Sequence, residues 1–177
     1  MGQNVSGQVF WPNGGLVEIP LTLHVKYDGC PQTSFDHEFN GGAYSFHIFL
    51  NPLLGCETIE LSLSGIANAR DFVSTLDLVR IMKHLLGTSP FTNALQYIAA
   101  DANNSYSASA LDLVEIRNVI LGVYQDWPNN NTLNFFHKTT PSAPALGAPL
   151  TSEVSIPLNG TSHVIDFWAV KTGDINH

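Results

Sequence analysis

The twelve residues from Asp101 to Asp112, DANNSYSASALD, place oxygen donors at the spacing of a calcium-binding loop. Asp101, Asn103, Ser105 and Asp112 stand at loop positions 1, 3, 5 and 12, and the Ser107 carbonyl stands at position 7. Calcium takes about six to eight oxygen ligands from carboxylates, amides, carbonyls and water. The spacing therefore predicts a calcium site at the start of the helix that follows.

Helix capping is a second explanation of Asp112. Ser109 and Asp112 have the spacing of a capping box, in which the carboxylate serves only the helix N-terminus. Ser74 and Asp77 have the same spacing. For Asp112 the D-x-N-x-S run upstream favours calcium, so we expect this residue to be a ligand.

Asp77 lacks such a run. Counting back from Asp77 places Ile66, Asn68 and Arg70 at the first three ligand positions. An apolar side chain and a cation cannot hold a dication. The first copy therefore has the end of a loop without its beginning.

The tail of the sequence, TGDINH, has the beginning of a loop without its end. Asp174 and Asn176 fit loop positions 1 and 3, and no residues follow to supply the later positions. We therefore predict a second, split calcium site, made by Asp174 and Asn176 from the tail and Asp77 from the helix start. Asp71 or the Phe72 carbonyl would supply the middle of this site. The alternatives are that GDIN opens a following module or forms a plain turn.

Both helix starts belong to a duplicated segment. STLDLVRIMKHLLG (74–87) returns 35 residues later as SALDLVEIRNVILG (109–122), which indicates a repeated structural unit. Each copy predicts an amphipathic helix that ends at Gly87 or Gly122, and FTNALQYIAA predicts a shorter helix between them. We expect the two helices to bury their apolar faces against each other. These faces are Leu78, Ile81, Met82 and Leu85, and Leu113, Ile116, Ile120 and Leu121.

The rest of the sequence reads as β-structure. From Asn4 to about Gly65, the runs VSGQVF, VEIPLTLHV, AYSFHIFL and TIELSLSG alternate between turn-forming stretches, which predicts a small all-β sandwich. Beyond Gly122, a Pro-rich stretch leads to two more strand-like runs, EVSIPL and HVIDFWAV.

These motifs resemble known families. The sequence STLDLVRIMKHLLG…IAADANNSYSASALDLVEIRNVILG…WPNNNT…AVKTGDIN is similar to type I dockerin-like modules of secreted Bacteroidota proteins. This resemblance covers roughly Asn68 to Asn176. VSGQVF…GAYSFHI resembles the small prealbumin-like or CNA-B-like sandwiches of bacterial surface proteins. The resemblance implies a mixed, two-domain fold, with an all-β sandwich over residues 1–65 and a dockerin-like helical pair with trailing β-strands over residues 66–177.

The resemblance also carries functional expectations. It implies calcium ligation by the donors of the 101–112 loop, a secreted or cell-surface setting, and docking onto a cohesin. Family loops carry glycine at the sixth position, where the turn favours positive φ. Tyr106 stands there instead, which predicts a strained or altered loop.

Composition narrows the function further. The net charge is -8, the pI is about 5.1 and only 12% of residues are charged, so nucleic acid and membrane surfaces are poor partners. No apolar run is long enough to span a membrane, and the start MGQNVSGQVF lacks signal-peptide features, so we interpret the sequence as a mature or excised segment. Cys30 and Cys56 are either a disulfide, if the chain is secreted, or two buried thiols.

Catalysis is not expected, because no HExxH, GxSxG or P-loop string occurs. We predict a non-enzymatic, calcium-binding structural or adhesion module of a secreted or cell-surface protein, in contact with neighbouring modules of the same chain. The alternative is a recognition module that docks a cohesin-like partner.

Overall fold

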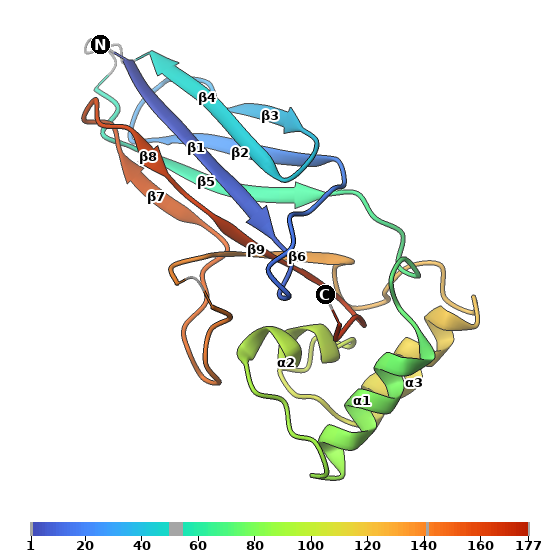
Figure 1. The fold of residues 1–177 in the computed structure, drawn as a ribbon. Helices are drawn as coiled ribbons and strands as arrows, with labels where there is room; N and C mark the ends of the chain where they lie inside the picture. The colour runs from blue at the N-terminus through green and yellow to red at the C-terminus, as the bar shows by residue number, and fades with distance from the viewer. Residues whose placement is uncertain (1, 50–54, 141, 177) are drawn as a thin grey trace.

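The computed structural model describes residues 2–49, 55–140 and 142–176. Within these ranges the chain forms nine strands in two sheets and three short helices (Figure 1). None of the helices in the described ranges has the length and apolar character needed to cross a bilayer. The structure is therefore mostly β, with the helices as a smaller part.

The first sheet has the strand order β4-β1-β9-β6, with β8 also paired to β1. Its strands are β1 (Gly2–Phe10), β4 (Ala43–Phe49), β6 (Leu133–His137), β8 (His163–Val164) and β9 (Phe167–Lys171). β1 is antiparallel to β4 and parallel to β9, and β9 is antiparallel to β6. The C-terminal strand thus lies between the first strand of the chain and β6.

The second sheet is antiparallel throughout and has the order β3-β2-β5-β7. Its strands are β2 (Leu21–Asp28), β3 (Phe35–Phe39), β5 (Thr58–Gly65) and β7 (Val154–Pro157). Side chains alternate between solvent and core along these strands, as the two-residue period predicts. The inward faces of both sheets share one hydrophobic core, whose wholly buried members include Val5, Val9, Leu23, Ile59, Leu61 and Phe167.

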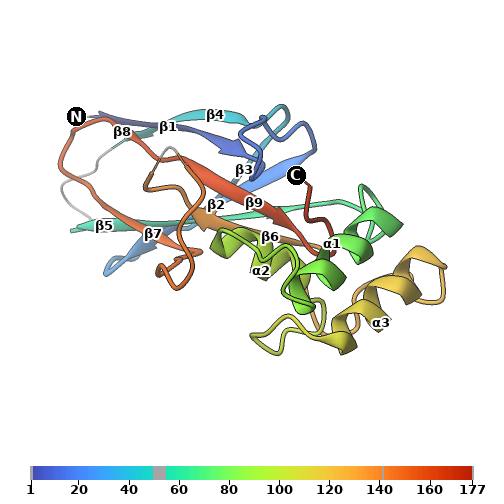
Figure 2. The same cartoon turned by 60° about the horizontal axis from the view of Figure 1, so that its bottom comes forward.

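The three helices form an insertion between β5 and β6: α1 (Thr75–Leu85), α2 (Ala94–Ala100) and α3 (Ala110–Ile120). They gather at the end of the sandwich where β9 finishes (Figures 1 and 2). Each of α1 and α3 begins with a capping box, so the predicted helix starts are confirmed. α1 contacts α3, and α2 contacts β9.

β9 connects the two halves of the molecule because it is buried on both faces. Phe167 and Ala169 belong to the core between the sheets. Trp168 and Val170 belong to a second core, which they share with helix residues such as Ile81 and Ile116. The helices therefore pack on the outer face of the first sheet.

The predicted fold class is wrong. The expected sandwich of residues 1–65 is incomplete without the C-terminal strands, because β9 and β8 pair with β1 and β7 pairs with β5. A dockerin-like helical pair with trailing strands is not indicated, since those strands are part of the sandwich and the helices are short. The period-two pattern identified the strands, but it carries no information about which distant strand each one pairs with.

Cys30 and Cys56 form a disulfide with a Cα–Cα distance of 5.0 Å. It joins the segment after β2 to the segment before β5, at the end of the second sheet far from the helices. Of the two alternatives left open by the sequence, the structure contains the bonded pair.

We expect a fragment ending at Gly65 to remain unfolded, because β1 would lose β9 and β5 would lose β7. The fragment would also expose the core positions that Phe167 and Ile156 cover. Far-UV circular dichroism and amide NMR of the fragment, with the full chain as control, would check this. A dispersed NMR spectrum and a cooperative thermal unfolding transition would show that residues 1–65 fold as an independent domain.

Candidate calcium sites

The 101–112 loop closes around the carboxylate of Asp101, which follows α2 directly and is 8% exposed. The backbone N–H groups of Ser105 and Tyr106 donate to Asp101 Oδ1 and Oδ2, at 2.8 and 2.7 Å. Asn130 holds the start of the loop by donating from Nδ2 to the Asp101 carbonyl at 2.6 Å. The chain therefore wraps around the residue that was predicted to be the first ligand.

Asp112 closes the loop from the first turn of α3 and is completely buried. Its Oδ2 accepts hydrogen bonds from both the N–H and the Oγ of Ser109, each at 2.8 Å, so the capping box is present. Its Oδ1 accepts from the N–H of Asn103 at 3.1 Å, nine residues earlier in the chain. Asp112 therefore combines the capping role with a direct contact to the loop, and the two explanations do not exclude each other.

The remaining predicted donors lie between these two carboxylates. Asn103 Oδ1 accepts from the N–H of Ser105 at 3.0 Å. Ser105 Oγ lies 3.3 Å from the Ser107 carbonyl and 3.2 Å from Ser107 Oγ. Hydrogen bonds thus link all five predicted donors in one loop, while calcium binding by them stays a prediction.

Tyr106 adopts φ = 62°, in the left-handed region that favours glycine. Its ring is 93% exposed and gains little from packing, so the loop itself imposes this conformation. The sequence predicted strain at this position, and the backbone geometry agrees.

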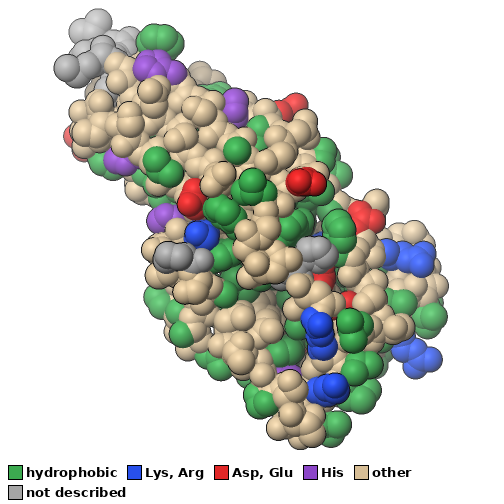
Figure 3. All heavy atoms as spheres, in the orientation of Figure 1, with side chains coloured by type: hydrophobic (Ala, Val, Ile, Leu, Met, Phe, Trp, Pro, Cys, Tyr) green, Lys and Arg blue, Asp and Glu red, His purple; other side chains and the backbone are tan. Residues whose placement is uncertain are grey.

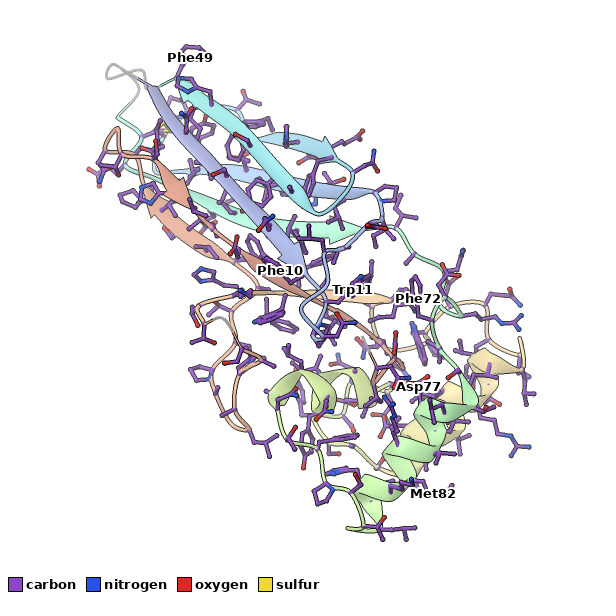
Figure 4. The ribbon with its side chains drawn as sticks, viewed as in Figure 1. Phe10, Trp11, Phe49, Phe72, Asp77 and Met82 are labelled. Atoms are coloured by element: carbon purple, nitrogen blue, oxygen red, sulfur yellow. A yellow bond between two sulfur atoms is a disulfide. The ribbon has the colours of Figure 1, made fainter. Side chains whose placement is uncertain are left out.

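The tail and the first helix start also come together. Asp77 is wholly buried at the first turn of α1 (Figure 4), and its Oδ1 accepts from Ile175 N at 3.0 Å and from Asn176 Nδ2 at 2.7 Å. Asp174 is 2% exposed and accepts from the N–H of Asn176 at 2.9 Å. The structure thus brings Asp77, Asp174 and Asn176 into one cluster, as the split-site hypothesis requires.

The end of β9 fixes the position of this tail. Thr172 N donates to the Thr132 carbonyl at 3.1 Å, and Gly173 N donates to the Ala99 carbonyl at 2.7 Å. Gly173 has φ = 86°, and a Cβ at this position would lie 2.8 Å from the ring of Trp127. Glycine is therefore required both by the turn and by the close approach of the indole.

Asp71, proposed as a middle ligand, lies in the turn before α1. Its Oδ2 accepts from the N–H and the Nδ2 of Asn68, at 3.0 and 3.1 Å, which closes a turn before α1. Phe72, the other proposed contributor, has φ = 65° and a half-exposed ring. Ligation by Asp71 or by the Phe72 carbonyl therefore stays a prediction.

Sequence reasoning missed two charged residues beside these sites. Lys171 is 1% exposed, and its Nζ donates to the Ala69 carbonyl at 2.8 Å. Burial lowers the pKa of Lys171 to about 8, although the negative charges of Asp71 and Asp174 oppose this shift. Burial raises the pKa of Glu115, and the negative charges of Asp112 and Asp101 raise it further. Glu115 stands one helical turn after Asp112, a spacing that could have identified it.

A Ser–His–Asp arrangement also occurs, on the outer face of the second sheet. His24 Nδ1 lies 2.7 Å from Asp36 Oδ1, and His24 Nε2 lies 2.8 Å from Ser64 Oγ. The His24 and Asp36 side chains are 41% and 63% exposed, so water competes for each contact. We interpret the group as a polar cross-strand ladder rather than an active site.

Comparisons with protein families, curated proteins and solved structures found no match for this chain. Among the described residues there is also no group of three or more His, Cys, Asp or Glu side chains placed to hold a metal. The predicted sites have two carboxylates each, and their other donors are amide, hydroxyl and carbonyl oxygens. The calcium prediction therefore depends on mixed oxygen ligands rather than on a carboxylate cluster.

We expect Asp101→Ala and Asp112→Ala to abolish binding of the same calcium ion, because each removes one of its two carboxylates. The double variant should then be little worse than either single variant. Calcium calorimetry of the three variants measures this. Ser109→Ala is the matched comparison: it weakens the cap by about 1 kcal/mol and removes one hydrogen bond to Asp112, so it should weaken calcium binding without abolishing it. If Asp112→Ala bound calcium normally, Asp112 would cap the helix without being a calcium ligand.

Proposed function

We propose that the chain is a non-enzymatic structural module of a secreted or cell-surface protein, in which calcium rigidifies the helical insertion. The observation that carries this proposal is the 101–112 loop, where five oxygen donors at calcium-loop spacing form one hydrogen-bonded unit. A calcium ion there would tie the end of α2 to the start of α3.

The electrostatics of the loop support a cation. Asp101 and Asp112 place two buried carboxylates at the start of α3, and their negative charges raise the pKa of Glu115, which lies one helical turn further on. No Lys or Arg of the described residues forms an ion pair with these three. Buried carboxylates of like charge destabilise one another, and a dication would reverse this repulsion.

The disulfide supports the proposed location. Disulfides form and persist in oxidising environments such as the cell surface and the extracellular space. The Cys30–Cys56 bond is therefore consistent with a secreted or cell-surface protein. The millimolar calcium of such environments also suits weak loops, since extracellular modules bind calcium with a Kd of about 10⁻⁴–10⁻³ M.

A recognition function is the second candidate, and a surface feature of the helices favours it. Equivalent apolar positions of the two repeats are exposed in both copies: Leu76 and Leu111 by 51 and 68%, Val79 and Val114 by 44 and 55%, Leu86 and Leu121 by 71 and 62%. Three residues that the sequence spacing assigned to the buried faces are thus exposed, because Met82 and Leu85 are 49 and 38% exposed and Leu121 is among the positions above. Contiguous exposed apolar side chains are typical of interaction surfaces.

Exposed cations lie among these apolar positions, in a protein whose net charge is -8. Arg80 and Lys83 are exposed on α1, and Arg117 is exposed on α3. Figure 3 shows basic and apolar side chains together over the helices. This surface suits a cohesin-like protein partner that presents apolar side chains and carboxylates.

The melting temperature tests the structural proposal. With a Kd of about 10⁻⁴–10⁻³ M, 10 mM calcium should stabilise the folded state by about 1.4–2.7 kcal/mol relative to chelator. For a chain of this length, that corresponds to a rise of about 3–10 °C. Scanning calorimetry in chelator, calcium and magnesium measures the shift. An identical melting temperature in chelator and calcium would contradict the proposal.

The recognition function predicts that Leu76→Asp combined with Leu111→Asp abolishes binding to recombinant cohesin domains, because both copies of the apolar surface gain a charge. Phe49→Asp is the matched control, since Phe49 is 79% exposed at the far end of the sandwich (Figure 4). Calorimetry in calcium measures the binding. If wild-type protein binds none of the cohesins, this second candidate is rejected and the structural proposal is unaffected.

A further inference from the structure

The GDIN tail is the one sequence motif that the proposed function does not use. Asp174, Ile175 and Asn176 repeat the D-x-N pattern of Asp101, Ala102 and Asn103. Asp77 and Asp112 are equivalent positions of the duplicated segment. The chain therefore holds two D-x-N segments and two helix-start carboxylates, but only one pair is continuous in sequence.

The two carboxylates make the same hydrogen bonds through Oδ2 and related ones through Oδ1. Asp77 Oδ2 accepts from the N–H and Oγ of Ser74, each at 2.8 Å, as Asp112 Oδ2 does from Ser109. Each Oδ1 accepts from a backbone N–H of a D-x-N segment, but from different positions: Asp77 from Ile175, the second residue, at 3.0 Å, and Asp112 from Asn103, the third, at 3.1 Å. The second D-x-N segment reaches its carboxylate from 98 residues away in the sequence.

The amide of Asn176 provides a separate observation. Asn176 Oδ1 is buried and, within the described part of the chain, has no hydrogen-bond partner, whereas Nδ2 of the same amide donates to Asp77. A buried carbonyl oxygen without a donor is unfavourable, because it loses its hydration. Asn176 therefore presents an oxygen suited to a cation, beside two carboxylates that are at most 2% exposed.

We propose that Asp77, Asp174 and Asn176 form a second calcium site, split between the start of α1 and the C-terminal tail. The Phe72 carbonyl, 35 residues before that of Ser107, is the matching backbone ligand, and water completes the coordination. This site shares no residue with the 101–112 loop, so each site can be tested without the other.

Two neighbouring features shape the site. Calcium there would join the end of β9 to α1, and so fasten the helical insertion to the sandwich at a second point. Lys171 lies close enough to Asp174 for their charges to interact, and its positive charge opposes a dication. We therefore expect the split site to bind calcium more weakly than the loop site.

Calcium stoichiometry, measured by calorimetry on the full chain, tests the proposal. Wild-type protein should bind two ions, Asp101→Asn and Asp174→Asn should each bind one, and the double variant should bind none. Two ions bound by Asp174→Asn would overturn the split site, as would a wild-type stoichiometry of one that Asp101→Asn reduces to zero. A single wild-type ion lost only in Asp174→Asn would keep the split site and reject the loop site. No calcium binding by wild type rejects both.

Asn176→Ala separates ligand loss from misfolding, because it keeps both carboxylates and the backbone. Loss of a residue that only supports a ligand weakens metal binding about 10–100-fold, so loss of a direct ligand should weaken one of the two sites by about tenfold or more. In chelator the variant should still unfold cooperatively, with a melting temperature lowered only by loss of the Asn176 hydrogen bond to Asp77. Unchanged affinity at both sites would contradict the proposal.

Discussion

Burial of β9 on both faces is the constraint on which the rest of the structure depends. Phe167 and Ala169 fill the core between the sheets, while Trp168 and Val170 support the helices. Because β9 also pairs with both β1 and β6, the first sheet is complete only when the C-terminus has returned to the N-terminal strand. The same strand then delivers Asp174 and Asn176 to the cluster with Asp77 at the start of α1.

Local features were well predicted from the sequence, whereas long-range pairing was not. Ser74 and Ser109 mark the helix starts because capping chemistry is contained within four residues. The runs EVSIPL and HVIDFWAV were identified as strand-like, but their alternation does not specify partners, and the division at residue 65 followed from that ambiguity. The partners depend on packing between segments more than 100 residues apart, such as β1 and β9.

For the candidate sites, too, local features could be predicted and long-range proximity was harder to predict. The spacing of Asp101, Asn103 and Asp112 lies within one short segment, so the loop could be proposed from sequence alone. The proximity of Asp174 to Asp77 could be proposed only because each fragment lacked what the other has. Glu115 and Lys171 were missed because their significance comes from burial beside other charges, which periodicity does not reveal.

The C-terminal strands complete a β-sandwich, and the helical insertion that it carries buries a carboxylate at the starts of both α1 and α3. Our central claim is that calcium occupies these starts. The most direct measurement is an anomalous difference map from crystals grown in calcium, collected at a wavelength where calcium scatters anomalously. We predict one peak enclosed by Asp101 and Asp112 and another between Asp77 and Asp174. Absence of both peaks from the map, with crystals grown in 10 mM calcium, would contradict this claim.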